Sequence, residues 1–412
     1  MRDSRTDFTQ RNTAIDIFRA LTMFIMVFVN DFWKANDIPR WLDHAKRGDT
    51  FVGLADYVLP CFLFVVGMSI PFAIERRYHK GSGESTIAHI LSRTFALLVM
   101  GAFITNTENS SWERLSPEVC YNVGVYWILM VVGFVCVWNL YPLTDNKNRK
   151  RLFTALKFVG VGILLFLAIT FKDVRGNVFA ARWGILGNIG WTYCVCAFIY
   201  IYTRDRLKLL IPVWAVFVLI CILGSTMTEQ YGGKALLTLP RSNFYNDFLN
   251  IFRIGNGSSC AFTMGGILLS LLSVKYAHVN SSRKILFALI AFAVFLTASW
   301  IAGHFWVLSK NAATPAWVFY ITAIAIAVYS LIYWLVEKGK AKWFDVIKPA
   351  GTATLTCYCL PYVMYGLAHL TGIKLPDWYT FGFMSIINCL SFAFFIVGLT
   401  YLLSKIHIKL KI

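Results

Sequence analysis

Long apolar stretches alternate with short polar segments along the whole chain. A helix needs about 20 apolar residues to cross a bilayer, and helix is the expected state because backbone groups in lipid must be satisfied within the segment. The chain is therefore predicted to be an all-α, polytopic membrane protein. The twelve predicted spans lie at roughly 14–33, 52–75, 88–106, 120–140, 152–171, 185–202, 209–226, 256–274, 284–303, 316–336, 351–370 and 383–403.

Basic residues are spread unevenly over the loops between these spans. Clusters such as Arg76-Arg77 and Lys147 to Arg151 fall on one side of the predicted bundle. Cytoplasmic loops carry an excess of Lys and Arg, so both termini are predicted to be cytosolic. The polar N-terminus lacks a small-residue cleavage site, and we interpret the first apolar stretch as a retained span.

Composition supports a membrane protein and argues against nucleic-acid binding. The 412 residues are 58% hydrophobic and only 15% charged, whereas a soluble domain is nearer one quarter charged. The formal net charge is +18, but the basic residues form short clusters, none long enough to follow a phosphate backbone. We expect one transmembrane domain over residues 1–412, in which the long external loop at 227–255 could form a lid or rim.

The ten cysteines lie mostly inside apolar stretches. Spacings such as Cys194-x-Cys196 and Cys357-x-Cys359 fit neither a zinc site nor a redox CxxC motif. We therefore expect these side chains to act as small apolar fillers, and we predict no metal site.

Polar residues gather at the predicted external mouth. His44 is the best candidate for a general base, because a histidine side chain titrates near physiological pH. Asp56 or Asp31 could orient it or hold a polar substrate. Asp56 is unusual because a carboxylate at the edge of a span is costly unless it is compensated. The residues assigned to this mouth are Asn30, Asp31, His44, Asp56, His304, Lys310, Asn311 and His369.

Each of these residues also has a purely structural interpretation. His44 could be an ordinary exposed loop histidine. Asp56 could cap the first turn of its helix. Lys310 could be a lysine that reaches the membrane interface from the end of a span. The grouping of the residues at one mouth favours a functional role over these alternatives.

Two arginines stand out on the predicted cytosolic side. Arg19 lies one turn inside the first span, where it could pair with Asp16, three residues away on the same helix face, or with a phosphate group. Arg93 begins the third span. From their charge and side, Arg19 and Arg93 are the candidates for binding an anionic ligand.

Several motifs resemble the heparan-α-glucosaminide N-acetyltransferase family and its bacterial relatives. The more specific ones are the segments Ala14 to Ala20 and Met26 to Asn30, His44-Ala45, and Ala55 to Gly67. Weaker pieces follow at Trp183 to Gly190, at Leu308 to Asn311 with Thr314 to Trp317, and at Pro349 to Thr352. The predicted spans at 120–140 and 152–171 look like an insertion relative to the family core.

The resemblance implies transfer of an acetyl group from cytosolic acetyl-CoA to the amine of a glucosamine-type sugar across the membrane. It implies that His44 is catalytic with Asn30 as its polar partner, and that Asp56, Lys310 and Asn311 surround the acceptor. A homodimer is also implied. The compact loops favour a bacterial cytoplasmic membrane.

The sequence leaves two questions open. The acceptor could attack the thioester directly, or the acetyl group could first rest on His44. The alternative function is a twelve-helix, proton-coupled transporter of a sugar or organic anion, with Asp56 as the coupling carboxylate. Against that alternative, no repeat of six helices is evident, and the polar residues lie at the mouths instead of the membrane centre.

Overall fold

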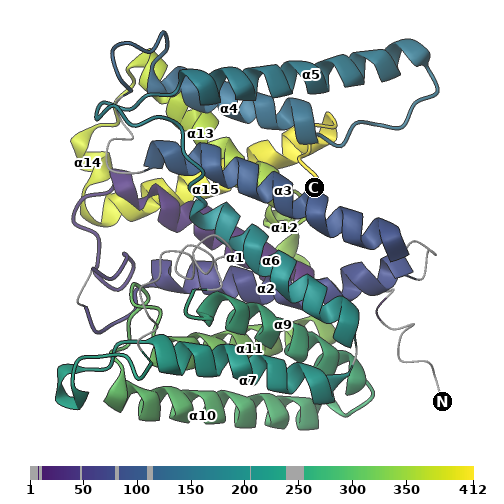
Figure 1. Ribbon diagram of the computed structural model, residues 1–412, viewed down its shortest axis with the longest axis vertical. Helices are drawn as coiled ribbons and strands as arrows, with labels where there is room; N and C mark the ends of the chain where they lie inside the picture. Colours follow the sequence, from purple (N-terminus) through teal and green to yellow (C-terminus); the bar gives the residue numbers. More distant parts are fainter. Residues whose placement is uncertain are drawn as a thin grey trace. The chain divides into compact units, whose positions relative to one another are not determined.

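A computed structural model describes residues 8, 12–46, 49–78, 83–108, 115–204, 206–237 and 255–412. Helices account for the regular structure of these residues, which confirms the predicted all-α class (Figure 1). The elements are α1 Thr13–Asn30, η2 Asp31–Lys34, α2 Leu54–Tyr78, α3 Gly83–Glu108, α4 Val123–Trp138, α5 Lys147–Thr170, α6 Gly184–Thr203, α7 Leu207–Gly224, η3 Glu229–Tyr231, α9 Ser258–Lys275, α10 Ser281–Phe305, α11 Pro315–Glu337, η4 Lys342–Val346, α12 Lys348–Thr352, α13 Thr354–Thr371, α14 Asp377–Thr380 and α15 Gly382–Lys405.

Ten helices in the described part of the chain are long and apolar enough to cross a membrane, so the protein is an integral membrane protein. The two remaining predicted spans are also helical. Helix α4 has only 16 residues, and the span predicted at 351–370 is divided at Ala353 between α12 and α13. Helix α13 is not among the ten, and it carries three tyrosines, which reduce its mean hydropathy.

The chain divides into two compact units, each assembled from separate segments. The first comprises Met1–Thr22, Pro39–Thr94 and Asn188–Asp345, and the second comprises Met23–Ile38, Phe95–Gly187 and Val346–Ile412. Helices α1, α3 and α6 each contribute residues to both units. A single domain over the whole chain stays a prediction.

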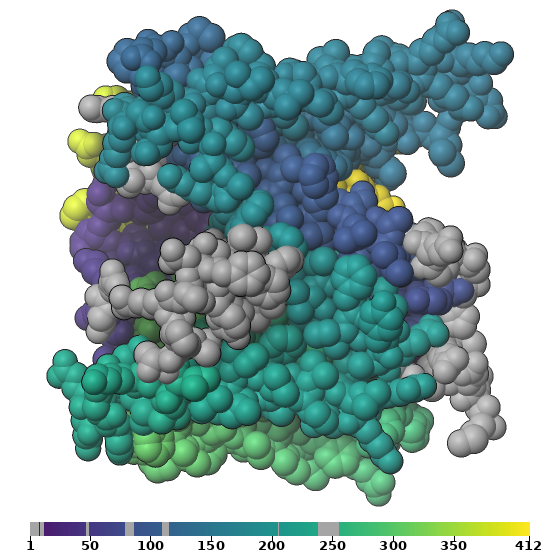
Figure 2. Space-filling model, in the orientation of Figure 1, coloured from purple at the N-terminus to yellow at the C-terminus, as the bar shows by residue number. Residues whose placement is uncertain are grey.

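In the first unit, α2 packs directly against α9 at two glycines. A methyl group on Gly67 would lie 1.9 Å from the carbonyl oxygen of Thr263, and one on Gly266 would lie 2.0 Å from that of Phe64. Close backbone approach at small residues is a common way for membrane helices to associate. Helices α10 and α11 lie side by side next to α9 (Figure 1). Helix α10, in light green in Figure 2, is exposed along one side, where apolar side chains such as Phe287 and Leu289 are more than half exposed.

In the second unit, α4 packs between α5 and α13. Glycines again allow the approach, because a methyl group on Gly160 would lie 2.6 Å from the Cβ atom of Cys136, and one on Gly366 would lie 2.7 Å from the carbonyl oxygen of Gly124. The predicted insertion corresponds to α4 and α5, and α4 is well integrated into this unit. Its status relative to the family core stays a prediction.

The external loop predicted as a lid lies largely outside the described residues. Its first part contains η3, and residues 238–254 are not described. The ten cysteines are all free, and most are buried, as expected for apolar fillers.

Candidate active site

Four of the predicted residues meet at one place in the first unit. His44 and Ala45 lie on the loop before α2, Asp56 lies in the first turn of α2, and Lys310-Asn311 lie on the loop between α10 and α11. The two loops are joined by a hydrogen bond from the Asn311 Nδ2 amide to the Ala45 carbonyl oxygen at 3.0 Å. Two segments more than 260 residues apart are thus held against each other.

Asp56 is the centre of this cluster, and its side chain is fully buried. Its Oδ2 atom accepts hydrogen bonds from the backbone N–H groups of Ala45 at 2.9 Å and Gly53 at 3.2 Å. Its Oδ1 atom lies 2.8 Å from His44 Nδ1 and 3.0 Å from Lys310 Nζ. Burying this carboxylate costs free energy, but both of its oxygens have hydrogen-bond or ion-pair partners that offset the cost.

These contacts assign a tautomer to His44. The Lys310 ammonium lies 2.9 Å from His44 Nδ1, and the ring nitrogen cannot both accept from it and donate to Asp56. An ionised carboxylate only accepts hydrogen bonds and an ammonium only donates them. Lys310 can direct a proton to the same Asp56 oxygen, 3.0 Å away, whereas Asp56 can only accept. We therefore place the Nδ1 proton in the hydrogen bond from His44 to Asp56. Nε2 is left as the basic nitrogen of a side chain that is 49% exposed.

The position of Asp56 satisfies both interpretations drawn from the sequence. It is the third residue of α2, and its carboxylate reaches back to the N–H of Gly53, which precedes the helix. This is the acceptor geometry of a capping box. The same carboxylate holds His44 through its other oxygen. Helix capping therefore fixes the carboxylate that orients the histidine.

The loop that carries Lys310 is itself fixed by the start of α11. Thr314 is the N-cap of this helix, and its hydroxyl accepts the N–H of Trp317. The N–H of Ser309 also donates to the Thr314 hydroxyl, at 3.3 Å. Pro315 occupies the first helical position, where its missing N–H costs nothing. The N-cap thus holds this short loop in place, and both Lys310 and Asn311 reach the loop that carries His44.

The other predicted residues of the first unit lie elsewhere. His304 is exposed on α10 and packs edge-on against Trp300; it takes no part in the hydrogen bonds around His44. Arg19 pairs with Asp16 at 3.4 Å, as the sequence spacing predicted, and donates to the Ser69 hydroxyl at 2.6 Å.

Arg93 has a different environment from Arg19. Its guanidinium lies over the ring of Tyr193 at 4.7 Å. Its Nε atom is buried without a hydrogen-bond partner among the described residues. A buried arginine N–H without a partner costs free energy, and an anionic ligand would satisfy it.

Asp31 and Asn30 belong to the second unit. Asp31 is 1% exposed, forms an ion pair with Lys34 at 2.9 Å, and accepts a hydrogen bond from the Tyr365 hydroxyl at 2.9 Å. Asn30 lines a separate pocket of about 250 Å³ together with Glu108 and several aromatic side chains. Its relation to His44 stays a prediction.

Sequence reasoning missed the aromatic residues of this pocket. Tyr358, Tyr362 and Tyr365 line it, and the Tyr362 hydroxyl donates to Glu108. Their spacing of four and three residues places them on one helix face, and this periodicity was the available signal. In the first unit, the Tyr57–Tyr320 hydroxyl pair at 3.1 Å had no comparable signal, because its residues are far apart in sequence.

Comparison with known proteins supports the motifs noted in the sequence. The family model for the catalytic region of heparan-alpha-glucosaminide N-acetyltransferase matches residues 11–115. The mouse protein of that name is 27% identical over 150 residues, which are 34% of this chain and 22% of the mouse protein. The human protein is 28% identical over 132 residues, which are 30% of this chain and 19% of the human protein.

The matches therefore concern one part of the chain, which spans about a fifth of the length of the curated relatives. The region matched by the family model includes Asn30, His44 and Asp56 and ends well before Lys310. The predicted resemblance is confirmed: residues 11–115 of this membrane protein are similar to the catalytic region of the heparan-alpha-glucosaminide N-acetyltransferase family.

Proposed function

We propose that this chain is a membrane-embedded acetyltransferase that moves an acetyl group from acetyl-CoA to the amine of a glucosamine-type sugar. The observation that carries the proposal is the half-exposed imidazole of His44, held through Nδ1 by a buried Asp56 carboxylate. The similarity of residues 11–115 to an N-acetyltransferase family supports the choice of reaction.

The proposed reaction uses His44 as a general base. The acceptor nitrogen attacks the carbonyl carbon of the thioester, and His44 Nε2 takes the proton of the attacking amine. The C–S bond breaks, CoA leaves as the thiolate and recovers a proton, and the acetylated amine is released. Asp56 stabilises the imidazolium that forms, as carboxylates do in other acid–base arrangements. Lys310 balances the charge of Asp56.

A double displacement through His44 uses the same geometry. In that path Nε2 attacks the thioester, CoA leaves, and the acetyl group is then passed to the amine. The exposed Nε2 serves both paths, so the choice between them is a matter for kinetics. Burst kinetics of CoA release without acceptor would identify the acetyl-histidine path.

The saturated state of Asp56 disfavours the transporter alternative. A coupling carboxylate must gain and lose a proton during the cycle. The two Asp56 oxygens already accept two backbone N–H groups, His44 and the Lys310 ammonium. Protonation would break at least one of these hydrogen bonds. The arrangement therefore favours the ionised form of Asp56, which orients His44 and Lys310.

The remaining assignments complete the proposal. Arg19 and Arg93 bind the phosphates of acetyl-CoA, and Asn311 and His304 contribute to the acceptor side. Asp31, which was predicted from the sequence to lie with them, already pairs with Lys34 and accepts a hydrogen bond from Tyr365, so we propose a structural role for it. Asn30 acts with His44. The protein works as a homodimer in a bacterial cytoplasmic membrane.

The direct test is transfer of labelled acetyl from acetyl-CoA to glucosamine by the purified full chain in detergent. We expect labelled N-acetylglucosamine with the wild-type protein. Saturable acetyl-CoA binding without transfer would show that the donor is right and the acceptor wrong. Neither binding nor transfer would overturn the proposal.

A further inference from the structure

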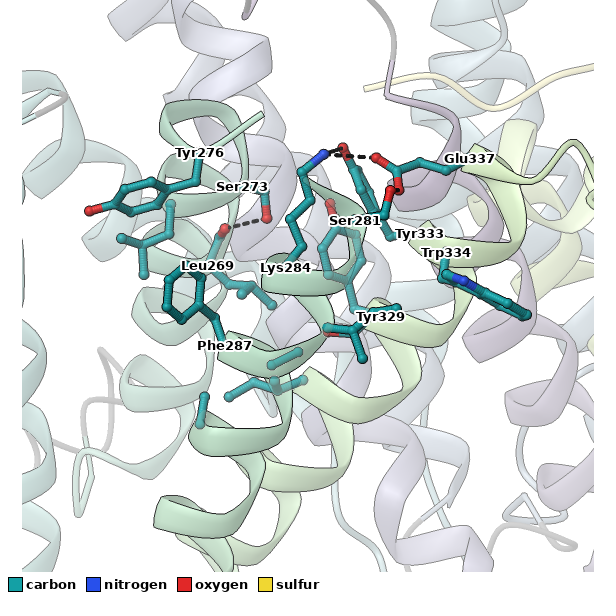
Figure 3. A pocket seen from close by; sticks show the side chains of 16 residues that line it. Leu269, Ser273, Tyr276, Ser281, Lys284, Phe287, Tyr329, Tyr333, Trp334 and Glu337 are labelled. Carbon is teal, nitrogen blue, oxygen red and sulfur yellow. Dashed lines mark hydrogen bonds and ion pairs between the residues drawn. The ribbon is translucent and has the colours of Figure 1, made fainter. Parts of the chain in front are cut away.

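A second cavity lies in the first unit, lined by α9, α10 and α11 (Figure 3). Its volume is about 360 Å³. Figure 3 shows Tyr276 just after the end of α9, Lys284 on α10 and Tyr333 on α11 around it. None of the residues proposed to take part in acetyl transfer lines this cavity, so it requires a separate explanation.

One end of the cavity is polar and charged. Lys284 Nζ donates to Glu337 Oε1 at 2.7 Å and to the Tyr333 hydroxyl at 3.2 Å. The Ser281 hydroxyl donates to the other oxygen of Glu337 at 2.7 Å. These contacts appear together in Figure 3. Because Glu337 is engaged by Lys284 and Ser281, its negative charge is balanced locally.

The helix ends that frame this polar end are strongly basic. Helix α9 ends at Lys275, α10 begins at Ser281, and α11 ends at Glu337. The segments 275–284 and 337–342 contain one acidic residue, Glu337, and six basic residues, which are Lys275, Arg283, Lys284, Lys338, Lys340 and Lys342. This end of the cavity therefore favours a negatively charged group.

Apart from Ser273, Tyr329 and Ser330, the rest of the cavity lining is mostly apolar, and the cavity opens toward the lipid. Its walls include Leu269, Ala288, Ala291 and Ile326. Residues 284 and 291 are separated by seven helical positions, or about 10 Å along α10. Only 11% of the most apolar stretch of α10 is buried, and Phe287 on the rim is 53% exposed. A hydrocarbon chain in the bilayer can thus reach the cavity from the side.

We propose that this cavity binds one acyl chain of an anionic phospholipid, whose phosphate lies at the basic helix ends. Basic pockets between transmembrane helices are suited to anionic headgroups, and the apolar walls match a hydrocarbon chain. The charge of the helix ends is what selects an anionic lipid over a zwitterionic one. The proposal is independent of the acetyl-transfer reaction.

Coenzyme A is also anionic and has a long arm, but it fits the cavity less well. Its arm carries two amides, each of which needs hydrogen-bond partners when it is removed from water. The lining residues Leu269, Ala288, Ala291 and Ile326 have only hydrocarbon side chains, and the Ser273 hydroxyl beside them already donates to the Leu269 carbonyl oxygen. An acyl chain makes no such demand.

The test is native mass spectrometry of the full chain in detergent, titrated with dioleoyl phosphatidylglycerol or dioleoyl phosphatidylcholine. We expect a saturable one-to-one adduct that favours phosphatidylglycerol. Ala288→Trp fills the cavity and should weaken the adduct about tenfold or more. The matched control is Ala293→Trp, because Ala293 is exposed on the same helix and does not line the cavity. Ala291→Leu serves as a second blocking variant.

A charge variant tests the headgroup assignment separately. Lys275→Gln with Arg283→Gln should remove most of the preference for phosphatidylglycerol, since each basic residue near a membrane surface is worth about fivefold. Lys147→Gln with Arg149→Gln, two exposed changes in the second unit, should leave the preference intact.

Three results would overturn the proposal. The first is equal binding of the two lipids by the wild-type protein. The second is an adduct that the blocking variants do not weaken relative to Ala293→Trp. The third is loss of a coenzyme A adduct, with lipid binding unchanged, in the blocking variants.

Discussion

Each unit of the molecule contains a buried carboxylate paired with a lysine, but the two arrangements end differently. Asp56 pairs with Lys310 at 3.0 Å and also holds His44, whose side chain is 49% exposed. Asp31 pairs with Lys34 at 2.9 Å and accepts the Tyr365 hydroxyl, while Lys34 lies over the rings of Tyr365 and Phe392 at 4.2 and 4.6 Å.

The difference shows that a carboxylate within a membrane span is not by itself a sign of chemistry. We call the Asp31 group closed because all its polar groups are used within it. Aromatic rings cover Lys34, and the Tyr365 hydroxyl donates to the Asp31 carboxylate. We call the Asp56 group open because one of its partners, the imidazole of His44, keeps its Nε2 atom available for a substrate. We therefore propose a structural role for Asp31 and a functional role for Asp56.

The largest expected effect comes from Asp56→Asn. An amide can no longer hold His44 in the assigned tautomer, because its NH₂ group donates where the carboxylate accepted. We expect the turnover number to fall by about 10³-fold or more, with the helical circular dichroism spectrum preserved. Turnover within about tenfold of wild type would contradict the role given to Asp56.

Lys310→Met should have a smaller effect on the same reaction. Asp56 keeps its two backbone donors and His44, but a buried carboxylate loses its balancing cation. We expect a loss of about tenfold in kcat/KM. The matched variant is Lys34→Met in the closed group, which should lower the melting temperature and leave kcat/KM of the folded protein unchanged. If the two variants behave alike, the distinction between the groups is wrong.

Asp31→Asn separates stability from activity. The change removes the ionic partner of Lys34 and weakens the bond from Tyr365. We expect a loss of about 1–3 kcal/mol in the free energy of unfolding, measured by denaturant or thermal unfolding in detergent. The KM for the acceptor should stay within about threefold. A much larger rise in this KM would restore Asp31 to the acceptor site.

Tyr365→Phe is expected to give the smallest change. It removes one donor from Asp31, and the ion pair with Lys34 remains. A single buried hydrogen bond of this kind is worth about 1 kcal/mol. Unfolding should report that loss, whereas acetyl transfer should be unaffected. A strong loss of transfer would indicate that the aromatic pocket takes part in the reaction.

Sequence patterns predicted the helices well because a membrane span is a continuous run of apolar residues that can be recognised locally. Helix α13 shows the limit: its tyrosines face a pocket, so its hydropathy falls although its helical state is unchanged. The pairing of Arg19 with Asp16 was also predictable, because residues three positions apart lie on the same face of a helix.

The candidate site was only partly predictable. His44 and Asp56 lie 12 positions apart, and the motifs around them predicted that both lie at the external mouth. The bond between Lys310 and Asp56 depends on how distant helices pack, which a single sequence does not encode locally. The bond from Tyr365 to Asp31 depends on distant packing in the same way. The pairing of Asp31 with Lys34, three residues away, could have been predicted like that of Asp16 with Arg19, and sequence reasoning missed it.

The most direct test of the central claim is chemical rescue of His44→Ala. Acetyl transfer from labelled acetyl-CoA to glucosamine is measured for the wild-type protein, for the variant, and for the variant with added imidazole. The account predicts that transfer is lost in a folded variant that still binds acetyl-CoA, and that imidazole restores part of it. Retained transfer in His44→Ala without imidazole would contradict the account.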